Sequence, residues 1–207
     1  MDISPPAERL KLTCRPGREG RTLVFEYALA NLQGRDVYVH DALPSVNLTT
    51  RAASANPRAV SVIHSPGGDA IIGKFLPPMP SSFRPAVPVI PLAHRLAPGE
   101  SMQRRLEAPE PLAETSPYMP DLLLRQYEIA DIAAVVFTIG YWISGSDGFC
   151  VAPTPYAEGL FSVVMVGGGP GAGTMLVSQR FATRGLQIFR RTDNFPRTIQ
   201  GTASAIG

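Results

Sequence analysis

A glycine-rich segment at residues 167–173 has the spacing of a dinucleotide-binding turn. Gly167, Gly169 and Ala172 fit the pattern G-x-G-x-x-[GA], and the apolar run at residues 161–166 suits a preceding strand. Glycines at these positions allow a tight turn and a close approach of the backbone to a pyrophosphate, which the N-terminus of a following helix stabilises. The segment is therefore the first candidate for ligand chemistry in this chain.

At this point the sequence resembles the N-termini of flavoproteins. That resemblance implies a helix at residues 175–183, a second strand at residues 185–189 and then an acidic residue for the ribose hydroxyls. The chain departs from the pattern there, because Arg190 and Arg191 occupy the region of the acid. The residues that follow are also too few for the further helix and strand of such a domain, so we expect no Rossmann sheet.

The alternative interpretation of the same residues is a β-hairpin. Residues 160–166 and 174–181 would be its two strands, and the glycines would form the tip, where they permit positive φ without any ligand. We expect this hairpin and no cofactor. In the competing hypothesis, a small flavin- or nucleotide-binding enzyme, Gly167, Gly169 and Ala172 would be the cofactor-binding residues.

The other reactive side chains lie at spacings that indicate no site. His40, His64 and His94 have no second metal-type ligand at a short spacing, so we predict neither a metal site nor catalytic residues. Cys14 and Cys150 lie far apart without a CxxC motif, and we expect two free thiols.

A small acidic run follows the middle of the chain. Glu107, Glu110 and Glu114 lie in a segment broken by prolines. Carboxylates are mostly exposed in folded proteins, and an acid pair for glycoside hydrolysis would need a defined separation in a cleft. We therefore expect these three acids to be solvated.

The chain is basic and aromatic after Glu158. Five arginines accompany Asp193 as the only acid, and phenylalanines are interleaved with them. Arginine and aromatic residues are prominent among the residues that carry protein interfaces. An arginine face solvated above core phenylalanines is the alternative, and stacking on single-stranded nucleic acid is a weaker one. The predicted partner-binding residues are Arg180, Phe181, Arg184, Phe189, Arg190 and Arg191.

Composition bounds the class of protein. The chain has 207 residues, and its 21 prolines and 19 glycines favour strands with many turns. Its net charge of +2 does not indicate nucleic-acid binding. The N-terminal residues show no basic stretch followed by an apolar one, so we expect a cytoplasmic protein. Residues 159–179 carry no charge but contain a glycine cluster and Pro170, and we expect no membrane span.

The elements that must position these residues are strands. Residues 21–30 and 36–43 alternate apolar and polar side chains about a short turn and predict a hairpin. Residues 133–143 are apolar on both faces, as in a central strand. Further strands are expected at residues 10–14, 59–64, 70–75 and 102–108. About seven strands with intervening turns predict a two-sheet sandwich.

The hairpin, the turn at residues 96–101 and the strand that contains Trp142 resemble immunoglobulin-like accessory modules of bacteria. We predict a mostly-β protein, with an immunoglobulin-like two-sheet sandwich over residues 1–144, a linker over 145–158 and a hairpin-like extension over 159–207. The expected function is a soluble, non-enzymatic accessory or protein-binding module. Its C-terminal basic and aromatic segment would dock on another protein or on a second copy of the chain.

Overall fold

The chain folds entirely into strands and turns over the residues that the structure describes. The computed structural model describes residues 10–46, 49–50, 53–77, 89–118, 127–166, 174–183, 185–192 and 202–205, and these contain no helix. The prediction of a mostly-β chain is confirmed. The strands are β1 (Leu10–Glu19), β2 (Thr22–Asn31), β3 (Val37–Val46), β4 (Ala53–Asn56), β5 (Ser61–His64), β6 (Ala70–Lys74), β7 (Leu92–Leu96), β8 (Ser101–Pro109), β9 (Leu112–Ala113), β10 (Tyr127–Asp131), β11 (Ala134–Ile143), β12 (Phe149–Pro153), β13 (Leu160–Met165), β14 (Met175–Ala182), β15 (Gln187–Arg191) and β16 (Thr202–Ala205).

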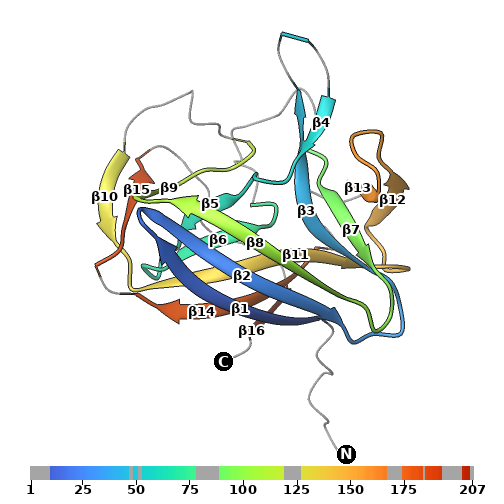
Figure 1. Ribbon diagram of the computed structural model, residues 1–207, viewed down its shortest axis with the longest axis horizontal. Helices are drawn as coiled ribbons and strands as arrows, with labels where there is room; N and C mark the ends of the chain where they lie inside the picture. The colour runs from blue at the N-terminus through green and yellow to red at the C-terminus, as the bar shows by residue number, and fades with distance from the viewer. Residues whose placement is uncertain are drawn as a thin grey trace, which may run out of the picture.

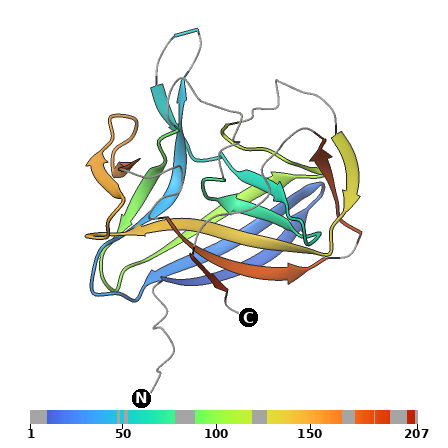
Figure 2. The same ribbon diagram turned by 180° about the vertical axis from the view of Figure 1, so that it is seen from behind.

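The described strands form three sheets (Figure 1). Two sheets have three strands each, in the orders β1-β2-β8 and β10-β15-β9. The third follows the order β12-β13-β7-β3-β11-β14-β16. In addition, β4 pairs with β3, β6 pairs with β11, and β5 pairs with β6. Seen from behind, β11 and β14 run side by side in front of β1 and β2 (Figure 2).

The main core lies between the sheet β1-β2-β8 and the strands β11 and β14. Phe25 and Tyr27 of β2 pack on Phe137 of β11, with ring centroids 5.1 and 5.0 Å apart. The alternation expected along β2 is present, since Phe25, Tyr27 and Leu29 are buried while Glu26 is exposed. The period of two therefore identified the buried face of this strand.

The hairpin predicted for residues 21–30 and 36–43 is wrong. Both segments are strands, but β2 pairs with β1 and β8, whereas β3 pairs with β4, β7 and β11. The fully buried Asn31 holds the connection between the two sheets. Its side-chain Nδ2 donates to the Arg35 and Leu96 carbonyls at 2.8 and 2.9 Å, and its Oδ1 accepts the Gln33 N–H at 3.0 Å. A polar side chain thus fixes a crossing between sheets where local spacing indicates a hairpin.

The central position predicted for residues 133–143 is confirmed. β11 pairs with β14 and β3 in antiparallel fashion and with β6 in parallel fashion. The strands predicted on either side of the turn at residues 65–69 are also confirmed, because β5 and β6 form an antiparallel pair. Strands from both halves of the chain therefore surround β11.

The predicted C-terminal hairpin is not formed by its two strands. β13 lies between β12 and β7, and β14 lies between β11 and β16, so β7, β3 and β11 separate them within the sheet. The C-terminal strands also belong to the main core, which contains Val177 and Ile188. In addition, the Cys14 N–H of β1 donates to Gln179 Oε1 of β14 at 2.8 Å. Buried apolar residues in β14 and β15 draw these strands into the fold.

One predicted surface acid, Glu114, is fully buried. Its Oε1 accepts the His64 N–H at 2.8 Å, and its Oε2 accepts the Arg191 N–H at 2.7 Å. The Glu114 N–H itself donates to the Phe189 carbonyl at 2.9 Å. The expectation of a solvated side chain is wrong here, because the carboxylate satisfies backbone donors of β5 and β15 that would otherwise lack acceptors.

Replacing Glu114 by glutamine is expected to lower the free energy of unfolding by about 2–3 kcal/mol, because an amide NH₂ would then face a buried backbone N–H. The matched control is Glu128→Gln, whose side chain is half exposed, with an expected change below about 0.5 kcal/mol. Urea unfolding monitored by circular dichroism measures both. Equal effects of the two substitutions would contradict this role of Glu114.

Candidate functional site

The predicted partner-binding residues do not form one surface. Arg180 and Phe181 lie on β14, whereas Phe189, Arg190 and Arg191 lie on β15, which belongs to a different sheet. The sixth residue, Arg184, lies outside the described residues. Residues that are close in the sequence therefore lie in two different sheets.

The β14 residues are engaged within the protein. The Arg180 guanidinium makes two contacts with the Asp69 carboxylate, at 2.9 and 3.0 Å, and this hydrogen-bonded carboxylate raises the pKa of Arg180. Phe181 is half-buried and packs against the main core. This part of the chain matches the alternative of an arginine above a core phenylalanine more closely than a contact surface.

The β15 residues divide between the interior and the surface. Arg191 is buried. Arg190 is half-buried and its Nη1 lies 3.0 Å from Glu128 Oε1, across the pair β10–β15. Phe189 is half-buried, with its ring 6.2 Å from that of Tyr127. Phe189 and Arg190 are thus the two predicted residues that reach solvent on this strand.

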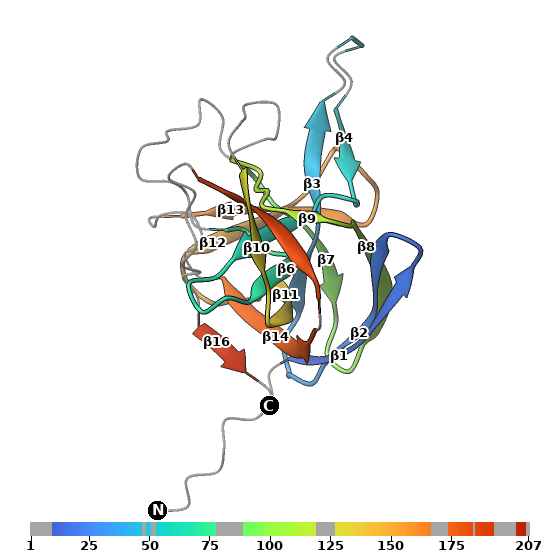
Figure 3. The same cartoon turned by 90° about the vertical axis from the view of Figure 1, so that its left-hand side faces the viewer.

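Two apolar residues that residue type and spacing did not indicate lie beside Phe189. Tyr127 and Ile129 of β10 have exposed fractions of 38% and 63%. A groove of about 290 Å³ adjoins Ile129 and Phe189 and reaches Arg18 and Glu110. Figure 3 shows β10 and β15 at the outer face of the molecule. The alternation of Tyr127 and Ile129 with polar residues was the available signal. Ile129 pairs with Phe189 and Glu128 with Arg190, so Tyr127, Ile129 and Phe189 lie on one face of these strands and Arg190 lies on the other. We call Tyr127, Ile129 and Phe189 the β10–β15 surface.

The glycines that suggested a cofactor, Gly167 and Gly169, and Ala172 lie outside the described residues. The helix that the flavoprotein resemblance requires after them is contradicted, because residues 175–182 form β14. A strand offers no cluster of free N–H groups at its start and no helix dipole to hold a pyrophosphate. The second strand expected at residues 185–189 corresponds to β15, which lies in another sheet.

The cysteines and histidines are dispersed. Cys14 and Cys150 are both free thiols, as expected, and burial raises the pKa of Cys14 to about 12 while Cys150 is exposed. His40 and His64 are buried and His94 is half-buried. Within the described part of the chain, no three His, Cys, Asp or Glu residues gather as metal ligands would.

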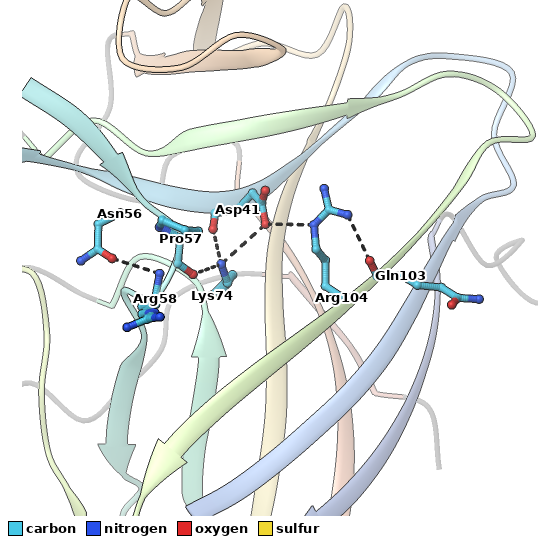
Figure 4. Close-up of polar contacts among 7 residues, drawn as sticks. All are labelled: Asp41, Asn56, Pro57, Arg58, Lys74, Gln103 and Arg104. Carbon is cyan, nitrogen blue, oxygen red and sulfur yellow. Dashed lines mark hydrogen bonds and ion pairs between the residues drawn. The ribbon is translucent and has the colours of Figure 1, made fainter.

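A cluster of charged side chains joins β3, β6 and β8 (Figure 4). The buried Lys74 Nζ donates to the Pro57 carbonyl at 2.6 Å and to the Asp41 carbonyl, and it lies 3.6 Å from Asp41 Oδ1. Arg104 Nε lies 3.7 Å from the same Oδ1. We call Asp41, Lys74 and Arg104 the Lys74 cluster.

The Lys74 cluster has the composition of a reactive site but the geometry of a structural one. Burial lowers the pKa of Lys74, and the Asp41 carboxylate opposes that shift. An ammonium has three hydrogens to donate, and Lys74 has three oxygens around it with a side chain that is only 5% exposed. Lys74 therefore ties β6 to β3 and to the turn after β4, with no face left for a substrate.

Replacing Lys74 by methionine is expected to destabilise the protein by about 3 kcal/mol, because it leaves the buried oxygens without their donor. Lys11→Met, at an exposed lysine of β1, is the control and should change stability by less than about 0.5 kcal/mol. Thermal and urea unfolding give both values. An unchanged stability of the Lys74 variant would overturn this assignment.

Comparison with known proteins adds no relative. No protein family matches the sequence, and neither a curated protein nor a solved structure matches the chain. Among the described residues, the structure has no helix of the length and apolar character that a bilayer crossing requires.

Proposed function

We propose that the protein is a non-enzymatic binding module that docks on another protein or on a second copy through the β10–β15 surface. This retains Phe189 from the predicted set and adds Tyr127 and Ile129, whereas Arg190 lies on the opposite face of the sheet. The immunoglobulin-like topology and a cytoplasmic location remain part of the same proposal.

The exposure of Ile129 is the observation that carries this proposal. Its side chain is 63% exposed and lies beside the half-buried Phe189 and the partly exposed Tyr127. An apolar group of this kind with an adjoining groove is typical of protein interaction sites. Tyrosine is also enriched among residues whose truncation weakens interfaces.

The test is affinity capture with two matched variants of the full chain. Ile129→Asp places a charge within the β10–β15 surface, whereas Leu32→Asp changes an equally apolar residue, 57% exposed, in the connection between β2 and β3. We expect proteins retained by the wild type and by L32D to be lost with I129D. Circular dichroism establishes that both variants are folded.

Retention of the same proteins by I129D would overturn the proposal. The competing enzyme hypothesis has its own measurement, an absorption spectrum of the purified protein and a thermal-shift screen with flavins and nicotinamide dinucleotides. A bound chromophore or a large shift would favour that hypothesis over a binding module.

A further inference from the structure

The strand β10 lies at the edge of its sheet as far as the described residues show. Among the strands that the structure describes, β15 is its one neighbour. In an antiparallel strand, alternate residues direct their backbone N–H and C=O groups away from that neighbour. Four of the five β10 residues are exposed, all except the half-exposed Ala130. β10 therefore presents backbone donors and acceptors to which another strand can be added.

The charges on β10 do not block such an addition. Charged side chains commonly keep edge strands apart, and β10 carries Glu128 and Asp131. Each is already engaged by β15, because Arg190 lies 3.0 Å from Glu128 and Gln187 donates to Asp131 Oδ1 at 2.9 Å. Arg190 thus compensates the negative charge of Glu128, and Gln187 satisfies one oxygen of Asp131, before any strand approaches.

We infer that β10 pairs in antiparallel fashion with β10 of a second copy, centred on Ile129. This inference rests on the proposed β10–β15 surface and names its partner. In this register Ile129 meets Ile129 of the second copy, Tyr127 lies opposite its Asp131, and Glu128 lies opposite its Ala130. No carboxylate of one copy therefore lies opposite a carboxylate of the other.

The order of residues in β10 selects this register over its neighbours. A pairing centred on Glu128 would place two carboxylates directly opposite each other, which is destabilising. A pairing centred on Ala130 would set the exposed Ile129 against Asp131 of the second copy. Centring on Ile129 alone joins the two most exposed apolar side chains and separates the acids.

The resulting assembly is closed and symmetric. A two-fold axis between the Ile129 residues makes each copy use the same surface, which is the commonest arrangement of soluble oligomers. The two sheets β10-β15-β9 become one continuous sheet, and both β10 edges are satisfied together. Tyr127, Ile129 and Phe189 of both copies then lie on one face, because alternate residues of a strand share a face.

Cysteine crosslinking at the two-fold axis tests the register. Ile129→Cys is made in a Cys150→Ser background, since Cys150 is the exposed native thiol and Cys14 is buried. Mild oxidation should convert most of the protein into a disulfide-linked dimer on a non-reducing gel. Leu32→Cys in the same background is the control and should remain monomeric. Equal crosslinking at both positions, or none at residue 129, would overturn the register.

Sedimentation of the full chain tests the association itself. We expect the wild type to dimerise with concentration, and Ile129→Asp to weaken dimerisation at least about tenfold, because two carboxylates would meet at the axis. A wild type that stays monomeric throughout would overturn the second copy as partner. The affinity capture tests the proposed function separately, because it detects a different protein that the wild type retains and I129D does not.

Discussion

Gly73→Ala should abolish the stable fold. Gly73 lies in β6 with φ of +154°, and a Cβ on it would come within 1.9 Å of the Thr138 carbonyl oxygen of β11. The Thr138 carbonyl carbon and nitrogen would lie at 2.9 and 3.0 Å. Because these are backbone atoms of the paired central strand, they cannot move aside without separating β6 from β11. We expect a loss of more than about 4 kcal/mol.

The matched control is Gly34→Ala, in the connection between β2 and β3. An added Cβ there meets no atom within 4 Å, so the variant should fold with nearly unchanged stability. Soluble yield, circular dichroism and thermal unfolding distinguish the two. A Gly73 variant that melts with the wild type would show that the parallel pairing of β6 with β11 is wrong.

Acidification should destabilise the protein through His40. His40 is buried, and burial together with the positive charge of Lys74 lowers its pKa from 6.5 to about 3. Below pH 6.5 the unfolded chain gains a proton at this residue that the folded chain does not. Stability is therefore complete above pH 6.5 and falls as the pH drops toward 3, by about 2 kcal/mol at pH 5 and about 4 kcal/mol at pH 3.

The comparison is with His40→Gln, which carries no titratable group at this position. The variant can be less stable than the wild type at pH 7, but its own loss between pH 7 and pH 5 should be smaller by about 2 kcal/mol. Urea unfolding at a series of pH values measures the difference. Parallel pH profiles would exclude His40 as the acid-labile group.

Local alternation predicted strands well but not their neighbours. Along residues 21–30 buried side chains recur mainly with period two, whereas residues 133–143 are buried on both faces. A sequence displays both patterns directly. The partner of each strand depends on contacts far along the chain. The Asn31 side chain, for example, reaches the Leu96 carbonyl and sends β3 into another sheet. The sequence of a short polar turn between two strands does not predict that contact.

The candidate site was predictable only in part, for a similar reason. Residue type identified Phe189, but the same criterion also chose Arg190, which lies on the opposite face of the sheet, Arg191, which is buried, and Arg180, which is held by Asp69. Glu114 was assigned to solvent because its partners come from β5 and β15. The proposed role of Ile129 depends on the edge position of β10 among the described strands, which becomes visible only when the sheet is assembled.

The hydrogen bond between the Cys14 N–H and Gln179 bears on the order in which the protein can fold during its synthesis. The first strand emerges from the ribosome long before β14, which it contacts in the finished core. Until residue 179 has been synthesised, β14 cannot pack on the apolar face of β1 and β2, and part of that face stays exposed. Contacts between residues far apart in the sequence also slow folding. The nascent chain is therefore expected to need protection from aggregation until translation has passed β14.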